Sequence, residues 1–549
     1  MPIQDNDLFL IDDGGTPKKV TAANLLANCE GSYADKFLLI NDNSDNSYKM
    51  KASNLKTKVA ESTTRWMLVE AGSSRGGIVA GTSYKAQNTT LAEYFASVSY
   101  WYNYMGGNQY SDTDYIEKVS VYDGHVYSFG YSRSLNSGSS YFHPTIIKKD
   151  MSGETIWKKY ISYGSGYDNY FSSGKVIGGY IYAVGRSKST IGYRDPWLVK
   201  LDTDGNIEWQ RSYGHSGQTT ADSWYGVDVD SSGNIYTAGR YKQSGSSYSQ
   251  AILAKWNSSG TLQWQRRFTS PSNIYTNGYD VAVDTSGNPY MIGDGYCTTA
   301  TNNTISGFII KFNSSGSYQW GRYYENVDND GHRSISIDSS NRIFVGGFWQ
   351  TDGYGSNALL LRYNTSGSLI WRRGFNANVN GGSGVAGGLS RPTRVTGLIT
   401  DNSGNVYIGG QHDTKIYPSN PILVAKVDSN GNLIWKTEII DSNIPTSLYN
   451  LTLDVSDDGL VVGAMRQSTD YEGANLHLPL DTALIGTYGD LTGSNDTTIL
   501  WITSVPGSHG NISSSNIDTP PFTTATPSHT IQNIPSSYWV DVLQTLDIS

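Results

Sequence analysis

Residues 227–268 carry the pattern that decides the fold: VDVDSSGNIYTAGR from Val227, a polar connector, and AILAKWNSSGTLQWQRRF from Ala251. Tight turns at Ser231–Asn234 and Asn257–Gly260 place glycine where a hairpin requires a positive φ. The stretch therefore predicts one four-stranded antiparallel unit. Its strand-like runs are Val227–Asp230, Ile235–Gly239, Ala251–Trp256 and Leu262–Arg266.

The same unit recurs along most of the chain. A glycine ends its second run at Gly130, Gly185, Gly239, Gly293, Gly346, Gly409 and Gly463, at intervals of 55, 54, 54, 53, 63 and 54 residues. The long interval contains an extra Gly- and Asn-rich loop at 374–390. A tryptophan on the fourth run follows at Trp157, Trp209, Trp264, Trp320, Trp371 and Trp435, with a delayed seventh at Trp501. The chain thus holds seven copies.

Four-strand units at this period can bury their faces only against neighbours in a closed ring. The predicted fold is all-β, a seven-bladed β-propeller of four-stranded blades over residues 115–504. The C-terminal tail, residues 505–549, is too short for an eighth blade. We expect it to cross a blade edge or to dock on the N-terminal region.

The N-terminal region has a smaller repeat of strand, turn, strand and short helix. Residues 7–25, DLFLIDDGGTPKKVTAANL, are echoed by residues 36–55, and a third copy is expected from Arg65–Val69, Gly76–Val79 and Thr90–Phe95. A Thr or Ser hydroxyl can cap the first turn of each helix. This predicts three α+β hairpin-helix modules, at 1–30, 31–60 and 61–98, and an aromatic hinge at 99–114.

Composition narrows the function. The chain has 549 residues, a net charge of −9 and only 16% charged residues, without a basic stripe. We therefore expect no nucleic-acid partner and no membrane insertion. The first residues are acidic where a secretory signal would be basic, and Cys29 and Cys297 lie far apart. We expect no signal peptide, no disulfide and folding in a reducing cytoplasm.

The N-terminal repeat, of the form DLFLIxxGGTxxKVTAxNL, resembles modules at the N-termini of structural proteins from tailed bacteriophages, especially phages of cyanobacteria. The resemblance implies a virion component, assembled in the host cytoplasm and attached through these modules to other tail or baseplate proteins. The residues expected to carry attachment are Leu8, Phe9, Leu10, Phe37, Leu38 and Trp66. It also implies a homo-oligomer, a trimer by analogy with other fibres. A generic β-hairpin domain is the alternative.

The turn-plus-tryptophan signature, as in Asp202–Trp209, is similar to repeats of pyrroloquinoline-quinone dehydrogenases and of bacterial repeat propellers. The adjacent cysteines expected over that quinone are missing, and no cofactor is expected. In the sialidase Asp-box the tryptophan stands three residues after glycine, whereas here it stands four residues after. The signature therefore indicates packing: Asp or Asn starts the turn, Gly permits it, and Trp inserts between blades.

Catalytic and metal signals are weak. Neither HExxH nor GxSxG occurs, so the chain is expected not to be an enzyme and to have no catalytic residues. Carboxylates recur just before the first strand of several blades, at Asp168, Asp222, Asp280 and Asp330, and first strands line the channel. They are the candidates if the chain degrades a glycan, with solvated loop residues as the simpler interpretation. Asp454–Gly459 imitates a calcium loop but has Met465 at the twelfth position, so no metal site is expected.

The long loops, between the second and third strands and between blades, fall on one face of the ring. They are rich in aromatic residues, which suit stacking on sugars, and packing or contact with a neighbouring virion protein is the alternative. The connector 240–250, with Tyr241 and Tyr248, belongs to this face. The candidate ligand-binding residues are Tyr163, Tyr167, Tyr170, Tyr213, Trp224, Tyr225, Tyr323, Tyr324, Trp349 and Tyr354.

Together these features predict a tail-fibre or baseplate appendage that displays its propeller to a host surface, contacting a glycan or a protein. A head fibre or capsid decoration protein, a glycan-degrading propeller enzyme and a cellular scaffold are the alternatives.

Overall fold

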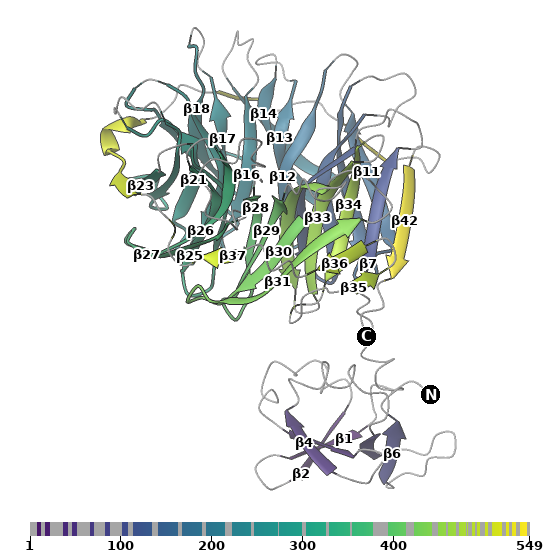
Figure 1. Ribbon diagram of the computed structural model, residues 1–549. Coiled ribbons are helices and arrows are strands. Elements are labelled where there is room, and N and C mark those ends of the chain that lie inside the picture. Colours follow the sequence, from purple (N-terminus) through teal and green to yellow (C-terminus); the bar gives the residue numbers. More distant parts are fainter. Residues whose placement is uncertain are drawn as a thin grey trace. The chain divides into compact units, whose positions relative to one another are not determined.

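A computed structural model gives the architecture of the chain (Figure 1). It describes residues 8–12, 17–21, 37–41, 47–51, 66–70, 83–87, 101–107, 114–133, 141–162, 167–188, 194–214, 222–242, 246–272, 274–298, 304–325, 329–351, 354–376, 393–412, 422–441, 448–456, 459–467, 471–478, 480, 486–488, 491–494, 500–502, 505, 508–518, 523–525, 530–533 and 539–545. The chain divides into two compact units, Met1–Ser99 and Tyr100–Ile548, with Ser549 grouped with the first.

The first unit contains three antiparallel hairpins, which coincide with the three sequence repeats. They are β1 (Leu8–Asp12) with β2 (Pro17–Thr21), β3 (Phe37–Asn41) with β4 (Ser47–Lys51), and β5 (Trp66–Glu70) with β6 (Ser83–Gln87). The first strand of each hairpin pairs with the first strands of the other two. The six expected attachment residues lie on these three strands. The expected helices lie outside the described residues, and the third copy places its second strand at β6 instead of Gly76–Val79.

The second unit is a seven-bladed β-propeller. Blades one to four are β8 (Asp114–Tyr122), β9 (His125–Ser132), β10 (His143–Asp150) and β11 (Thr155–Ser162); β12 (Tyr170–Ile177), β13 (Tyr180–Ser187), β14 (Asp195–Asp202) and β15 (Ile207–Gly214); β16 (Ser223–Val229), β17 (Ile235–Tyr241), β18 (Gln250–Trp256) and β19 (Leu262–Phe268); and β20 (Thr276–Val283), β21 (Pro289–Gly295), β22 (Ser306–Phe312) and β23 (Tyr318–Glu325).

Blades five and six are β24 (Gly331–Ile337), β25 (Ile343–Thr351), β26 (Tyr354–Tyr363) and β27 (Leu369–Asn376); and β28 (Thr393–Thr400), β29 (Val406–His412), β30 (Ile422–Val427) and β31 (Leu433–Asp441), with β35 (Gly486–Tyr488) outside them. Blade seven combines β32 (Leu448–Ser456), β33 (Gly459–Gln467) and β34 (Tyr471–Leu478) with a fourth strand from the other end of the chain, β7 (Trp101–Gly107). The segment expected to form a hinge is therefore the strand that closes the ring.

Strand register also identifies the seventh tryptophan. Trp101 of β7 pairs with His477, just as Trp209 pairs with Lys200 in the second blade. The sequence-based choice, Trp501, was wrong, because that residue belongs to a tail strand paired with the fifth blade. Sequence spacing alone could not reveal this, since the fourth strand of the last blade comes from before the first blade.

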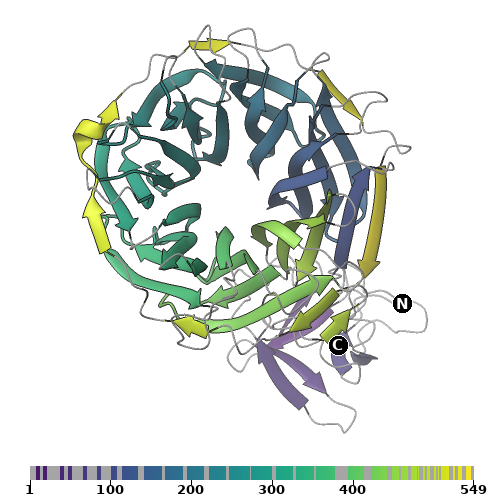
Figure 2. The ribbon, with the colours of Figure 1, turned by 45° about the horizontal axis from the view of Figure 1, so that its top comes forward.

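The tail contributes an additional outer strand to every blade. In chain order these are β36 (Leu491–Ser494) on blade six, β37 (Leu500–Ile502) on five, β38 (Ser508–Asn511) on four, β39 (Ile517–Asp518) on three, β40 (Thr523–Ala525) on two, β41 (Thr530–Asn533) on one and β42 (Trp539–Thr545) on seven. A short 3₁₀ helix, η2 (Ser514–Asn516), precedes β39. Figure 2 shows these strands, in yellow, around the outside of the ring. We call residues 491–545 the belt.

The belt is held by side chains as well as backbone pairing. Ile512 is buried among residues of blades three and four, and its backbone N–H donates to the carbonyl oxygen of Gly321 at 3.1 Å. Asp518 forms a two-point ion pair with Arg267 on the outer strand of blade three. Since unpaired edge strands promote aggregation, the belt protects the outer edges of all seven blades.

The tryptophans clasp neighbouring blades. The Trp209 indole N–H donates to the carbonyl oxygen of Ser258 in the next blade at 3.2 Å, and its ring covers Gly260. A Cβ on Gly260 would lie 2.9 Å from that ring, and its φ is +76°, so two constraints select glycine there. Equivalent indole hydrogen bonds come from Trp157, Trp264, Trp320, Trp371 and Trp435.

The repeated second-strand glycine has a different cause. The first strand of each blade contains a register shift, and a carbonyl oxygen at the shift presses on the partner strand. A Cβ on Gly185 would lie 1.9 Å from the Tyr170 carbonyl oxygen. In blades five and six this position is Gly347 and Gly410, one residue after the glycines chosen from sequence spacing. No helix in the described part of the chain is long and apolar enough to cross a membrane.

Two truncations test ring closure. Removing residues 1–99 deletes the first unit and should leave a folded propeller. Removing residues 1–107 also deletes β7, which lies between β34 and β42, and should open the seventh blade. We expect thermal melts and size-exclusion chromatography to show a monodisperse, cooperative protein only for the first truncation. Equal melting temperatures for both would contradict closure by β7.

A single substitution tests the belt. Ile512→Ala removes a buried side chain that joins the tail to blade four, so it should lower the free energy of unfolding by about 2–5 kcal/mol. Ser514→Ala, at an exposed belt residue, should change it by less than about 0.5 kcal/mol. Urea unfolding followed by tryptophan fluorescence measures both. A belt that is only loosely attached would give the same midpoint for the two variants.

Candidate functional site at the channel mouth

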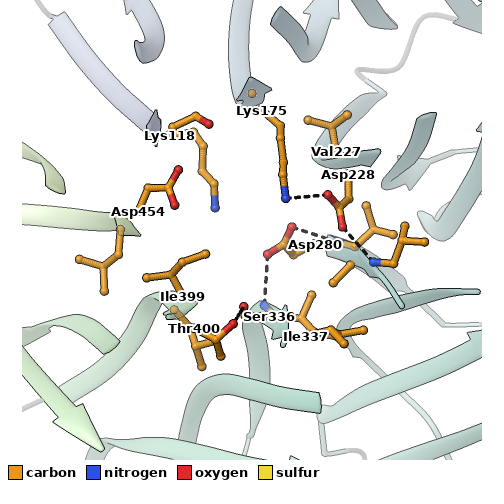
Figure 3. A pocket seen from close by; sticks show the side chains of 18 of the residues that line it. Lys118, Lys175, Val227, Asp228, Asp280, Ser336, Ile337, Ile399, Thr400 and Asp454 are labelled. Carbon is orange, nitrogen blue, oxygen red and sulfur yellow. Dashed lines mark hydrogen bonds and ion pairs between the residues drawn. The ribbon is translucent and has the colours of Figure 1, made fainter. Parts of the chain in front are cut away.

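The first strands of the seven blades surround a polar central channel with a cavity of about 250 Å³ (Figure 3). The two-residue alternation of a strand sends one set of side chains into this space and the other toward the next strand or blade. The charged lining residues are Lys118, Lys175, Asp228, Asp280 and Asp454. Polar groups thus occupy a position that a packed core would fill with apolar side chains.

Many of these polar groups join one blade to the next. Asp228 accepts a hydrogen bond from the Val283 backbone N–H of the following blade at 2.9 Å, and Asp280 accepts one from Ile335 at 3.2 Å. Every blade junction has such a link. The others are Val176 N to Ser120 Oγ, Lys175 Nζ to Asp228 Oδ1, Ser336 Oγ with Thr400 Oγ1, Leu451 N to Thr396 Oγ1, and Val121 N to Asp454 Oδ2.

The charges in the channel are unequally matched. Lys175 and Asp228 form an ion pair at 2.8 Å, which raises the pKa of Lys175. Burial raises the pKa of Asp280 and of Asp454. Lys118 projects into the space near both (Figure 3), and no ion pair joins it to another residue in the described part of the chain. The main role of these carboxylates is therefore to join neighbouring blades through hydrogen bonds and ion pairs. Because they are held in this way, they have limited freedom for chemistry.

Toward the long-loop face the channel ends in a mouth of about 160 Å³. The register shift in each first strand adds one residue that points into this mouth, as β-bulges commonly re-aim a side chain. These residues are Glu117, Ser172, Tyr225, Tyr279, Arg333 and Thr396, one from each of the first six blades. The packing residues repeat from blade to blade, whereas these six have five different identities. This variety indicates that the repeat does not require one particular side chain at this position.

Arginine–tyrosine pairs surround the mouth. The Arg186 guanidinium lies 4.1 Å from the centre of the Tyr170 ring, Arg240 lies 5.7 Å from Tyr225, and Arg333 lies 4.2 Å from Tyr279. Arg333 also pairs with Asp294 at 2.9 Å. Among the described residues, no carboxylate forms an ion pair with Arg186 or Arg240. Burial lowers the pKa of Arg186, and its Nε is buried without a hydrogen-bond partner.

A second hollow adjoins Arg240 on the same face. It has a volume of about 490 Å³ and is lined by Arg240, Lys242, Ser247, Tyr248, Ser249, Tyr275 and Asn277. We call it the blade-three hollow. Two of its lining side chains are cationic and none is acidic. Tyr248 is 45% exposed, whereas the neighbouring Tyr241 is buried at 1%. Within the connector, the described residues Arg240, Lys242, Ser247, Tyr248 and Ser249 therefore line an open polar surface.

The ten aromatic residues proposed from sequence have different locations. Tyr213, Trp224, Tyr324 and Trp349 are buried in the hydrophobic core and present no ring to solvent. Tyr323 lies under Gly510 of the belt. Tyr167, Tyr170 and Tyr225 are half-buried, with a lysine or arginine over each ring. Tyr163 and the side chain of Tyr354 lie outside the described residues.

The recurring carboxylates mostly brace loops. Asp222 accepts the Lys242 backbone N–H at 2.9 Å, and Asp330 accepts that of Gln350 at 3.2 Å. Asp168 accepts the Phe142 N–H at 3.1 Å. Asp280 alone among the four lines the channel, because it lies within β20 and not before it. In the described part of the chain, no group of three or more His, Cys, Asp or Glu side chains could hold a metal ion.

Sequence reasoning missed Arg186, Arg240, Lys242 and Tyr275 as site residues. Aligning the repeats on the glycine opposite each register shift would have shown a variable position two residues before Val227, Val281, Ile335 and Leu398. This alignment marks Tyr225, Tyr279, Arg333 and Thr396, but none of the four missed residues. It could not have shown which variable residues share a cavity, because that depends on the closed ring.

Solved structures resemble this chain at low identity. No family model matches the chain, and no curated protein matches it. The β-propeller domain of the Trilobed protease from Pyrococcus furiosus matches with a TM-score of 0.41 and 9% identity, over 67% of this chain and 94% of that one. An acylaminoacyl peptidase from Pyrococcus horikoshii matches at 0.39 and 10%, over 67% and 52%. A putative 6-phosphogluconolactonase from Bacteroides uniformis matches at 0.34 and 9%, over 73% and 94%.

These matches correct one prediction. The expectation that the chain is not an enzyme is withdrawn, because solved propellers that match it are named as a protease, a peptidase and a lactonase. At identities of about 10% the likeness assigns no reaction to this chain.

The pH dependence of stability tests the placement of Asp222. Burial raises the pKa of Asp222 from 3.8 to about 8, so the folded chain holds this proton more tightly than the unfolded chain does. The stability contributed by the protonated carboxyl is complete below about pH 4 and is lost as the pH rises through 8. Asp222→Asn keeps an oxygen for the Lys242 N–H and abolishes this titration.

We therefore expect the stability of Asp222→Asn, relative to the parent chain, to rise between pH 5 and pH 8.5 by an amount on the order of a few kcal/mol. Asp518→Asn, at an exposed belt residue, is the control and should show no such rise. Denaturant melts at several pH values measure both. A constant difference across this range would show that Asp222 is ionised in the folded chain.

Proposed function

We propose that the protein is an adhesion component of a tailed-phage particle, a tail-fibre or baseplate appendage that presents the long-loop face of its propeller to the host surface. The observation that carries the proposal is the polar cavity system on that face. Its lining residues differ from blade to blade, while the tryptophans, turn glycines and core residues that build the ring repeat. In a repeat protein whose other positions are constant, the variable positions are the ones that select the binding partner.

The division of the chain supports separate roles for its two units. Three hairpins in residues 1–99 carry the motif that resembles phage attachment modules, and the propeller forms a unit of its own. Tail or baseplate proteins would bind the first unit, and a host glycan or protein would bind the second. Assembly as a homotrimer, with the virion as final location, completes the proposal.

The belt supports display of the propeller on the surface of a particle. A propeller crowded on a particle surface would present many outer blade edges to its neighbours, and a tail strand covers each of them. The same architecture would also serve a head fibre, so location on the particle has to be measured directly.

Immunogold labelling tests the proposal. An antibody raised against residues 100–549 should label the tail region of particles of the phage that encodes the chain, and the purified propeller should compete with those particles for host cells. Labelling of the head would instead indicate a decoration protein. Absence of the chain from purified particles, measured by mass spectrometry, would overturn the virion assignment altogether.

A further inference from the structure

We infer that the blade-three hollow and the adjoining channel mouth bind a carboxylate-bearing oligosaccharide of the uronic-acid type. The inference rests on the proposed function, because it names the chemical class of the host-surface ligand that the long-loop face would bind.

The cationic side chains on this face favour the binding of an anion. The net charge of the chain is −9, yet Arg186, Arg240 and Lys242 lie on this face, and no ion pair joins any of the three to an acid among the described residues. Burial lowers the pKa of Arg186, and the nearby charges of Arg194 and Arg240 lower it further. Asp222 lies nearby, but its pKa of about 8 keeps it mostly protonated at neutral pH. Partly buried like charges without compensation are stabilised when a ligand brings the opposite charge.

Other lining residues favour a sugar over a simple inorganic anion. Tyr248 and Tyr275 provide aromatic surface at the hollow, and Tyr225 and Tyr279 provide it at the mouth. Hydroxyl and amide groups alternate with them and can both donate and accept hydrogen bonds, as sugar hydroxyls require. They include Ser247, Ser249 and Asn277 at the hollow, and Ser172, Ser334 and Thr396 at the mouth.

The acidic residues of the mouth also favour a sugar over a small inorganic anion. Glu117 and Asp280 lie at the mouth and accept hydrogen bonds without donating them when ionised. A small inorganic anion would be repelled by both. A sugar whose rings carry hydroxyl groups beside their carboxylates can direct the carboxylates to Arg240 and Lys242 and the hydroxyl donors to Glu117 and Asp280.

Size and continuity indicate more than one sugar ring. An apolar cavity of roughly 150 Å³ holds one benzene ring. The mouth, at about 160 Å³, is of that size, and the hollow, at about 490 Å³, is about three times larger. Arg240 lines the hollow and lies over the ring of Tyr225, which lines the mouth, so Arg240 lies between the two spaces.

The test uses the full chain with trigalacturonate, its fully methyl-esterified form, maltotriose, monomeric galacturonate and sodium sulfate, each by isothermal titration calorimetry. Trigalacturonate should bind, and more tightly than the monomer because it spans both spaces. The methyl ester keeps the rings but loses the charge and should bind at least 10-fold more weakly, as should maltotriose and sulfate. Binding should weaken as salt is added.

Variants locate the site. Arg240→Gln should weaken trigalacturonate binding by about 10- to 100-fold, because a charge-assisted hydrogen bond is lost. Tyr248→Ala should weaken it, and Tyr248→Phe should keep most of it if the ring stacks on sugar. Arg267→Gln, on the outer edge of blade three, is the matched control and should bind like the parent. Melting temperatures without ligand should stay close to the parent value for the Arg240 and Tyr248 variants, since those side chains are partly or largely exposed.

Equal binding of trigalacturonate and its methyl ester, or binding that survives Arg240→Gln unchanged, would overturn the inference, as would the lack of binding by all the sugars. These results are independent of the particle. A chain that binds trigalacturonate through Arg240 but is missing from virions would retain this site and lose the proposed function. A virion adhesin with no preference for the charged sugar would do the reverse.

Discussion

The propeller depends on the contact between the outer-strand tryptophan of one blade and the turn glycine of the next. The indole ring fills the space above a glycine that can accept no Cβ, and the indole N–H satisfies a carbonyl group of the same turn. One side chain thereby sets both the spacing and the angle between neighbouring blades. In the seventh blade the register position of this tryptophan is occupied by Trp101 of β7, which comes from the N-terminal side of the first blade.

Closure creates two further constraints, one inside the ring and one outside it. Inside the ring, the first strands of the blades converge. Polar groups that would otherwise be buried there without partners link every blade to the next through hydrogen bonds. Outside, seven fourth strands would each leave an unpaired edge. The belt pairs with all of them, in the reverse order of the blades, so β7 and β42, from the two ends of the second unit, pair with each other on blade seven. These two strands thus complete the ring.

The candidate site is a by-product of the same geometry. Each first strand carries one extra residue where its register shifts, and the partner strand accommodates the displaced carbonyl by having glycine there in the first six blades. The extra residues face the channel mouth, where the rings of Tyr225 and Tyr279 contact each other across two blades and Thr396 accepts the Leu451 N–H of the next blade. They have five different identities in six blades, and they bring aromatic, hydroxyl and oppositely charged side chains together at one opening.

The sequence by itself determined the blade, the number of blades and the packing role of the turn-and-tryptophan signature, because these depend on local alternation, turn chemistry and period. It also marked the connector at Tyr248 as a place to look for function. It misplaced the seventh tryptophan, the closing strand and four of the ten aromatic candidates, which are core residues. Only the tertiary structure decided these, because alternation within a strand tells which residues share a face but not whether a neighbouring blade or a distant tail covers that face. The same reason explains why Arg186, Arg240 and Lys242 could not be grouped in advance: residues from different strands and blades become neighbours only when the ring closes.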